Sequence, residues 1–190
     1  MSWESTVTYY HRNAVTFISS PSLYMSTINI RPAHLEDKIA LQMLYKRTID
    51  YACTNDYDQQ QRDAWKRGTE NESRWDQAIS EQFFVIAEMD REIVGFGSLK
   101  NGCYIDFMYT DSRHLRKGIG LAIYKQLEAQ AIDRGTQVLT ADVSKTARPF
   151  FEKQGFSIIR ENHNLIRGVL ITNYHMQKKS IGDAGFPTSR

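Results

Sequence analysis

The chain has 190 residues, 41% of them hydrophobic and 24% charged, and a formal net charge of +2 at pH 7. This mixture is that of one globular domain and excludes a disordered chain, while the small net charge argues against nucleic acid as a partner. No apolar run is long enough to span a membrane, and Cys53 and Cys103 show no disulfide or zinc spacing, so we expect a cytoplasmic protein.

Residues 1–26 show no clear hydrophobic periodicity, and Met25 precedes the first segment with the hydrophobic pattern of a strand. We therefore expect an accessory N-terminal extension in 1–26, one folded domain in 27–179 and a flexible C-terminal tail in 180–190.

The folded domain opens with a short strand from Ile28 and a helix that ends near Ile49. The polar and aromatic segment 51–75 predicts a weak surface helix and a mobile loop. Three apolar stretches then predict three consecutive antiparallel strands, which are 83–89, 92–99 and 103–110. Gly95 and Gly97 in the second of them indicate a bulge or a close approach of another element.

A basic turn follows, and the helix that begins near Gly118 ends at Gly135. The strand 137–144 comes after this helix, so it is expected to lie parallel to the strand before the turn. A short helix over 146–153 precedes the last two strands, 156–162 and 168–177. The pattern predicts an α/β fold with a mixed, mostly antiparallel sheet of about seven strands flanked by helices.

The stretch YIDFMYTDSRHLRKGIG predicts a phosphate site, because the first N–H groups of a helix lack partners and attract an anion. Gly118 and Gly120 permit close approach of the backbone, and Arg113, Arg116 and Lys117 add positive charge. An ordinary strand-to-helix turn could show the same residues. A dinucleotide turn would need a third glycine where Ile123 stands, and no GK[ST] occurs.

These residues resemble the GNAT superfamily of N-acetyltransferases, whose signature [QR]xxGx[GA] corresponds to LRKGIG here. The stretches TARPFFEKQGF and RGVLITNYHM are similar to the YafP-like bacterial branch, and the resemblance spans Ile28 to Lys178. It implies a splayed parallel strand pair at an acyl-CoA site. Two departures stand out: Leu115 occupies the Gln or Arg position, and Phe151 replaces a tyrosine that is proposed to protonate the thiolate in many members.

The resemblance further implies that a primary amine of a small molecule, peptide or protein attacks acetyl-CoA directly in a ternary complex. No metal is expected, because no histidine spacing indicates one. In this family the backbone of the strand that corresponds to 103–110 pairs with the pantetheine arm, and a backbone N–H near Tyr109 would stabilise the oxyanion. The implied acetyl-CoA contacts are Met108, Tyr109, Thr110, Leu115, Arg116, Lys117, Gly118, Ile119, Gly120 and Phe151.

An amine is mostly protonated at pH 7, so a base is expected near the acetyl group. Asp106 is the first candidate, since it interrupts an apolar strand and, on period-two alternation, shares a face with Tyr104 and Met108. Apolar neighbours would raise its pKa. Asp106 could equally accept hydrogen bonds from a neighbouring loop. Asp142 is the reserve base, with a structural cap as its alternative role.

Tyr109 and Tyr174 are candidate proton donors to the departing thiolate, although a thiol can leave without help. Trp65, Trp75, Asp142 and His175 are candidate acceptor contacts, while packing of a loop on the sheet explains the tryptophans as well. Two other functions stay open, an inactive acyl-CoA-binding sensor and a basic patch for a polyanion. The chain is expected to be a monomer or a homodimer.

Overall fold

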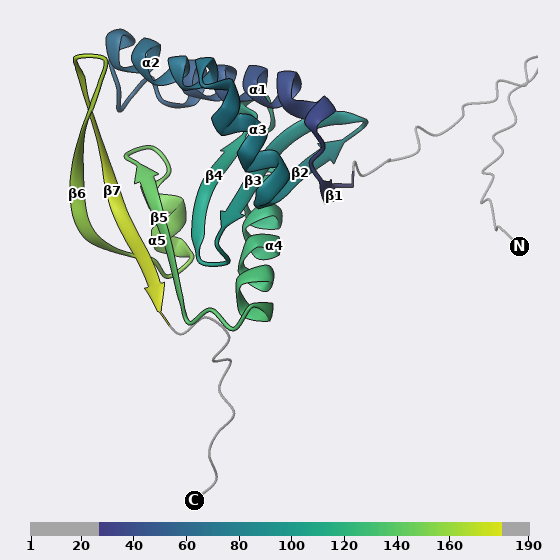
Figure 1. Ribbon diagram of the computed structural model, residues 1–190. Helices are drawn as coiled ribbons and strands as arrows, with labels where there is room; N and C mark the ends of the chain where they lie inside the picture. Colours follow the sequence, from purple (N-terminus) through teal and green to yellow (C-terminus); the bar gives the residue numbers. More distant parts are fainter. Residues whose placement is uncertain (1–26, 180–190) are drawn as a thin grey trace, which may run out of the picture.

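A computed structural model describes residues 27–179 (Figure 1). The segments 1–26 and 180–190, expected to be an extension and a tail, lie outside the described residues. The elements in chain order, with η for a 3-10 helix, are β1 (Asn29–Pro32), η1 (Leu35–Asp37), α1 (Lys38–Ala52), α2 (Gln59–Lys66), η2 (Arg67–Glu70), α3 (Glu72–Glu81), β2 (Phe83–Met89), β3 (Glu92–Lys100), β4 (Tyr104–Thr110), η3 (Ser112–His114), α4 (Ile119–Asp133), β5 (Val138–Ser144), α5 (Arg148–Lys153), β6 (Ser157–Ile166) and β7 (Val169–Lys179).

The strands form one seven-stranded sheet in the order β1-β2-β3-β4-β5-β7-β6. Only β4 and β5 run parallel, and the other neighbours are antiparallel. Helix α4 connects the parallel pair, as a crossover requires. The predicted mixed α/β sheet is therefore confirmed, down to its strand number and its one parallel pair.

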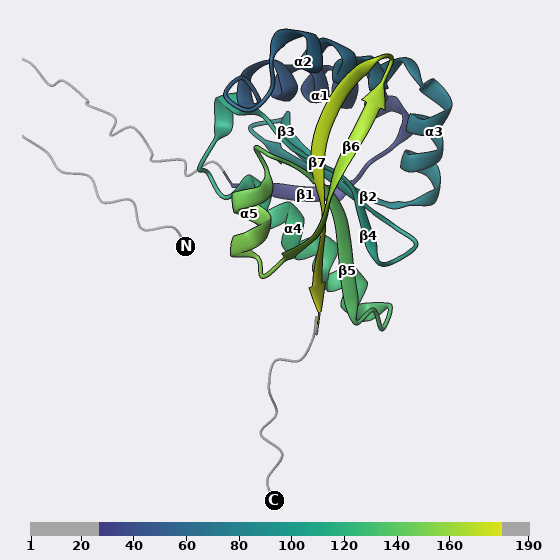
Figure 2. The same ribbon diagram turned by 90° about the vertical axis from the view of Figure 1, so that its left-hand side faces the viewer.

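The hydrophobic core lies in two layers, one on each face of the sheet. Residues of α4 and α5 pack on one face, around Ile123, Leu127 and Phe151. Residues of α1 and α3 pack on the other face, around Leu44 and Trp75. Figure 2 shows the β6–β7 hairpin reaching up to α2, where the Tyr57 hydroxyl donates to the carbonyl of Thr172 at 2.7 Å.

The segment 51–75 is more helical than its polar composition predicts. Capping explains this, because both α-helices that begin in the region start at a side chain that accepts a backbone N–H. Asp58 accepts from Gln61 N–H at 2.8 Å at the start of α2. Asn71 accepts from Arg74 N–H at 3.1 Å at the start of α3. The expectation of a mobile loop is thus wrong for most of this segment.

Helix α4 lies unusually close to β3 because two glycines of the strand carry no side chain. A Cβ atom on Gly97 would lie 2.6 Å from Ile123 Cγ2, and one on Gly95 would lie 2.8 Å from Ile123 Cδ1. The pairing of β2 with β3 also shifts register beside Gly95. The predicted close approach and bulge at these glycines are both confirmed, and they fix how near the helix sits to the sheet.

The contact of Gly97 with Ile123 gives a first prediction. Gly97→Ala should lower the free energy of unfolding by roughly 1–3 kcal/mol, because the added methyl group overpacks the helix–sheet contact. Urea denaturation measures the loss. Ile123→Ala supplies the control: in the double variant the loss should be clearly smaller than the sum of the two single losses. If the losses of the two single variants simply added, a steric conflict between residue 97 and Ile123 would be ruled out as the cause.

Candidate active site

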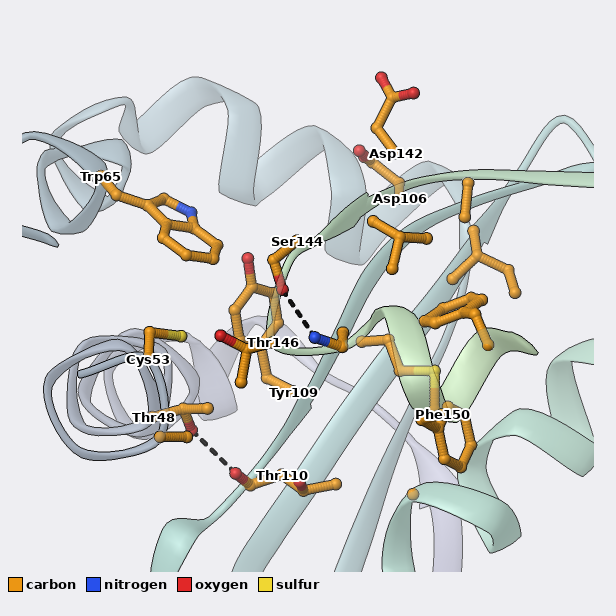
Figure 3. Close-up of a pocket in the computed structure, with 18 of the residues that line it drawn as sticks. Thr48, Cys53, Trp65, Asp106, Tyr109, Thr110, Asp142, Ser144, Thr146 and Phe150 are labelled. Atoms are coloured by element: carbon orange, nitrogen blue, oxygen red, sulfur yellow. Dashed lines mark hydrogen bonds between the residues drawn. The ribbon is translucent and has the colours of Figure 1, made fainter. Parts of the chain in front are cut away.

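The parallel pair β4–β5 separates after two residue pairs. Tyr104 pairs with Thr140 and Ile105 with Ala141, and no later pair follows between these strands. Beyond that point β4 stays bound to β3, and β5 stays bound to β7. A cavity of about 310 Å³ opens between the diverging strands, and it is also lined by α1 and by the start of α5 (Figure 3). The expected splayed pair is present.

A bulge in β4 coincides with this separation. Ser98 lies opposite Phe107 and Leu99 lies opposite Ile105, so Asp106 is the extra residue of the strand. A bulge bends its strand and changes the face of the residues beyond it. Accordingly Ile105 packs against the α4 layer, whereas Phe107 packs against the α1–α3 layer.

The backbone of β4 presents unpaired polar groups to the cavity. Asp111 N–H donates to the carbonyl of Val94 at 2.8 Å, and alternation along the ladder then points the amide groups of Tyr109 toward β3. The N–H groups of Met108 and Thr110 consequently point away from β3, where β5 no longer pairs with them. Of the three residues predicted to hold pantetheine, Tyr109 contributes its side chain rather than its backbone to the cavity wall.

The phosphate turn is built as the motif predicts. Gly118 has φ +81° and caps α4, and the first helical hydrogen bond runs from Ala122 N–H to the Gly118 carbonyl at 2.9 Å. The N–H groups of Ile119 and Gly120 therefore have no acceptor inside the helix. A Cβ atom on Gly118 would meet nothing within 4 Å. Gly120 lines the cavity, so the helix start and the cavity are continuous.

The cations of this turn differ in their freedom. Arg113 is held by Asp111, with Nη2 at 2.8 Å from Oδ2, so its charge is already paired within the protein. Arg116 and Lys117 are exposed, and among the described residues neither has a hydrogen-bond or ion-pair partner. Leu115, at the position where Gln or Arg was expected, is 55% exposed and lines the cavity with its apolar side chain.

Asp111 anchors the start of the turn and is fully buried. Its carboxylate accepts from Arg47 of α1 at 2.5 Å and from the backbone N–H of Arg113 at 2.9 Å. Burial raises the pKa of this carboxyl, but the hydrogen bonds from Arg113 and Arg47 outweigh burial and lower the pKa to about 2. The turn is thus tied to α1 by a charged contact.

Asp106 lies in surroundings that the alternation did not predict. Its Oδ1 accepts from Arg74 Nη2 of α3 at 2.8 Å, and its Oδ2 accepts from Gln82 Nε2 at 2.8 Å. The expected apolar neighbours and the shared face with Met108 are both wrong, because the bulge at Asp106 turns its side chain toward α3. Both oxygens are occupied, so the alternative reading of Asp106 as a hydrogen-bond acceptor describes its geometry better.

Aromatic side chains form much of the cavity wall, but not all those predicted. Trp65 and Tyr109 line it, and burial, followed by the neighbouring Tyr45, raises the pKa of Tyr109 well above its usual range. Trp75 is 1% exposed and packs 4.9 Å from the ring of Phe107, so it cannot touch an acceptor. Phe151 lines the cavity and is 4% exposed.

Tyr174 does not line the cavity. It pairs with Val143 across β5–β7 and packs against the α4–α5 layer, with its ring 5.3 Å from the Arg148 guanidinium. Its predicted role as a proton donor finds no support in this position. The β5 side instead contributes Asp142, whose Oδ1 lies 2.8 Å from His175 Nδ1 of β7.

Sequence patterns missed several residues of the cavity wall. Helix α1 contributes Thr48 and Ala52, Cys53 follows directly after it, and Ser144 at the end of β5 and Thr146 beyond it complete the set. The α1 residues follow no motif, and only the fold brings them to the splayed strands. Thr146 opens the stretch TARPFFEKQGF, so the resemblance could have indicated it.

Two further searches cover residues 27–179. No helix there is both long and apolar enough to cross a membrane. No group of three or more His, Cys, Asp or Glu side chains in this range is arranged to hold a metal ion.

Comparison with known proteins identifies the class of this fold and site. Residues 53–178 match the acetyltransferase (GNAT) domain. The chain is 31% identical over 155 residues to the uncharacterized N-acetyltransferase YafP of Escherichia coli K12, which covers 82% of this chain and 98% of that protein. The chain therefore belongs to the GNAT acetyltransferase family, in its YafP-like bacterial branch, and is an acyl-CoA-dependent acetyltransferase.

Solved structures agree with this assignment. A GCN5-related N-acetyltransferase from Rhodopseudomonas palustris is 31% identical, covers 82% of this chain and 97% of that chain, and superposes with a TM-score of 0.78. The PaiA N-acetyltransferase from Thermoplasma acidophilum shares the fold at 18% identity and a TM-score of 0.65, over 80% of this chain and 99% of that chain.

The charged contact of Asp111 gives a second prediction. A carboxyl whose pKa is lowered on folding stabilises the native state above its ordinary pKa of 3.8 and loses this contribution as the pH falls to about 2. Asp111→Asn should therefore lower the free energy of unfolding near neutral pH by about 2 kcal/mol, with roughly half that loss near pH 3. Urea denaturation at both pH values tests this, and a loss independent of pH would refute it.

Proposed function

We propose that this enzyme binds acetyl-CoA between β4 and β5 and transfers the acetyl group to a primary amine of a small molecule, a peptide or a protein. One observation carries the proposal: the unpaired N–H groups of Met108 and Thr110 lead directly to the open N-terminus of α4. An extended amide chain that ends in a diphosphate satisfies both groups of donors at once. Coenzyme A has this form.

Proteins of the same fold support this choice of co-substrate. The PaiA structure was solved in complex with coenzyme A. YncA from Salmonella typhimurium, a putative acetyltransferase by name, was solved with acetyl-CoA and superposes with a TM-score of 0.55 at 18% identity. In the present chain the N–H groups of Ile119 and Gly120 and the side chains of Arg116 and Lys117 would hold the phosphates. The Thr110 N–H and the Met108 carbonyl would pair with the pantetheine amides.

Acetyl-CoA supplies an activated acyl group in the form of a thioester, and the protein has to supply orientation, donors and a proton acceptor. The Met108 N–H points into the cavity and is the best-placed backbone donor for the thioester oxygen. Trp65 and Tyr109 cover the acceptor side with aromatic surface, which excludes water from the attacking amine. The carboxylates of Asp106 and Asp142 lie at the same end of the cavity (Figure 3) and favour a cationic acceptor.

The proton donor to the departing thiolate cannot be the residue at the position of the family's tyrosine. Phe151 has no hydroxyl group, and it occupies the place of the tyrosine in the family motif. Tyr109 is the predicted donor that lines the cavity, and its raised pKa keeps its hydroxyl protonated. A thiol of pKa about 8.5 can also leave as the anion at neutral pH.

The alternative function, an acyl-CoA-binding sensor without turnover, is not favoured by the match to N-acetyltransferases. The two functions separate in one measurement. The enzyme should release CoA thiol when acetyl-CoA is mixed with a panel of diamines, amino acids and N-terminal peptides, in amounts that match acetylated product found by mass spectrometry. A sensor would bind acetyl-CoA and yield no product with any amine of the panel.

The phosphate site gives its own prediction, in which the helix α4 provides a matched control. Gly118 and Gly135 flank its two ends, both have positive φ, and neither would meet an atom within 4 Å through a Cβ. Gly118→Glu and Gly135→Glu should therefore cause similar backbone strain of about 1 kcal/mol each. Only Gly118→Glu places a carboxylate where the diphosphate would bind.

Thermal unfolding with and without acetyl-CoA reads out the difference. A ligand present at a hundred times its dissociation constant stabilises the native state by about 2.7 kcal/mol. The wild-type protein and Gly135→Glu should show equal increases in melting temperature, and Gly118→Glu should show none. An undiminished increase in Gly118→Glu would place the diphosphate elsewhere.

A further inference from the structure

A carboxylate and an imidazole form a pair at the acceptor end of the cavity. Asp142 of β5 and His175 of β7 lie directly opposite each other in the antiparallel register, with Asp142 Oδ1 at 2.8 Å from His175 Nδ1. Asp142 lines the cavity, and the His175 side chain is 21% exposed. The Asp142 side chain is itself 36% exposed, so both members of the pair reach solvent as well as the cavity wall.

The surroundings hold this pair in place. Asn162 of β6 donates to Asp142 Oδ1 at 3.3 Å and to Asn173 Oδ1 at 2.9 Å, and Arg160 Nε donates to Asn162 Oδ1 at 3.0 Å. Tyr104 of β4 faces Asp142 from the other side. Burial, followed by the charges of Asp142 and Asp106, raises the pKa of Tyr104, so its hydroxyl stays protonated beside Asp142.

The other carboxylate of the cavity, that of Asp106, differs from Asp142 in its hydrogen-bond partners. Each oxygen of Asp106 accepts a short hydrogen bond, one from the permanently charged Arg74 and one from Gln82. The Gln82 side chain is itself fixed, since its Oε1 accepts from Ser98 Oγ at 2.7 Å. Taking up a proton at Asp106 would break one of these contacts. Among the described residues Asp142 has no such cation, and its partner His175 carries an imidazole, whose ring nitrogens can either donate or accept a proton.

We propose, resting on the acetyltransferase function above, that Asp142 is the base that deprotonates the acceptor amine and that His175 is its positioning residue and proton outlet. The acceptor arrives as an ammonium ion and gives one proton to the Asp142–His175 pair, which passes it to solvent through the imidazole. The neutral nitrogen then bonds to the acetyl carbon as the C–S bond breaks. The second proton of the nitrogen goes to the departing thiolate.

Asp142→Asn and His175→Gln test the pair. Each should lower kcat/KM for a primary alkylamine by about a hundredfold or more near neutral pH, which is the usual contribution of a general base. The double variant should lose about as much as either single variant, because the two residues act as one unit. The increase in melting temperature with acetyl-CoA should stay at the wild-type value in all three.

A neighbouring pair supplies the matched control. His163 and Glu161 of β6 also bring an imidazole near a carboxylate, at 3.7 Å, but both are about half exposed or more and neither lines the cavity. His163→Gln and Glu161→Gln change an imidazole and a carboxylate on β6, the strand that pairs with the strand of His175. They should keep wild-type kcat/KM.

The dependence on pH separates a base from a merely structural contact. An alkylamine with a pKa of about 10 deprotonates by itself as the pH rises, so a base becomes dispensable there. The ratio of wild-type to variant kcat/KM should therefore fall steadily between about pH 7 and pH 9.5. Charged groups near the pair are Arg160, Asp106 and, through Asp106, Arg74, and all three remain in the variants.

Three outcomes would overturn the assignment of the base. One is wild-type activity in both single variants. Another is a loss that is the same at every pH, which a structural role would cause. The third is a loss that depends on pH in Asp106→Asn but not in Asp142→Asn. A wild-type enzyme that acetylates no amine at all would instead overturn the proposed function, so the two failures can be told apart.

Discussion

The separation of β4 from β5 is the constraint on which the site depends. In the middle of a sheet every backbone N–H and C=O normally has a partner, and leaving such groups unpaired costs free energy. Here the pairing stops after Ile105 and Ala141, at the bulge formed by Asp106. The bulge bends β4 while β3 and β7 hold the two strands on their outer sides. The unpaired groups are thus held ready for a ligand with amide groups of its own.

Two contacts carry this local geometry to the rest of the domain. Helix α1 makes two hydrogen-bonded contacts with the end of β4. Arg47 binds the Asp111 carboxylate, and Thr48 Oγ1 donates to the Thr110 carbonyl at 3.0 Å. Helix α4 is held against β3 by the bare backbone of Gly95 and Gly97. The cavity wall and the phosphate turn therefore belong to the same rigid packing as the core, which suits a site that must hold a long co-substrate in one register.

The fold was predictable because its helices and strands show regular hydrophobic periodicity. The phosphate turn was predictable because Gly118 and Gly120 indicate a backbone conformation and a close approach that other residues disfavour. The positions and contacts of the candidate catalytic side chains were not predictable in this way. One inserted residue at Asp106 reverses the alternation that the sequence suggests, and no pattern in CYIDFMYT reveals it. Contacts such as Asp106 with Arg74 or Asp142 with His175 join residues from distant strands and helices, and single-sequence periodicity contains no information on such pairs.

The two carboxylates of the cavity, Asp106 and Asp142, are the same chemical group, but their hydrogen-bond partners suit them to different roles. Asp106 meets a guanidinium and an amide, both of which can only donate to it, so its ionised form is fully used in holding α3 against β4. Asp142 meets an imidazole, which can donate or accept, and a tyrosine hydroxyl. A group whose partner can exchange a proton is suited to transfer chemistry, and a group whose partners cannot is suited to structure. The acceptor end of the cavity thus combines an ion-paired carboxylate that fixes α3 with a second carboxylate that can accept the proton of an ammonium acceptor.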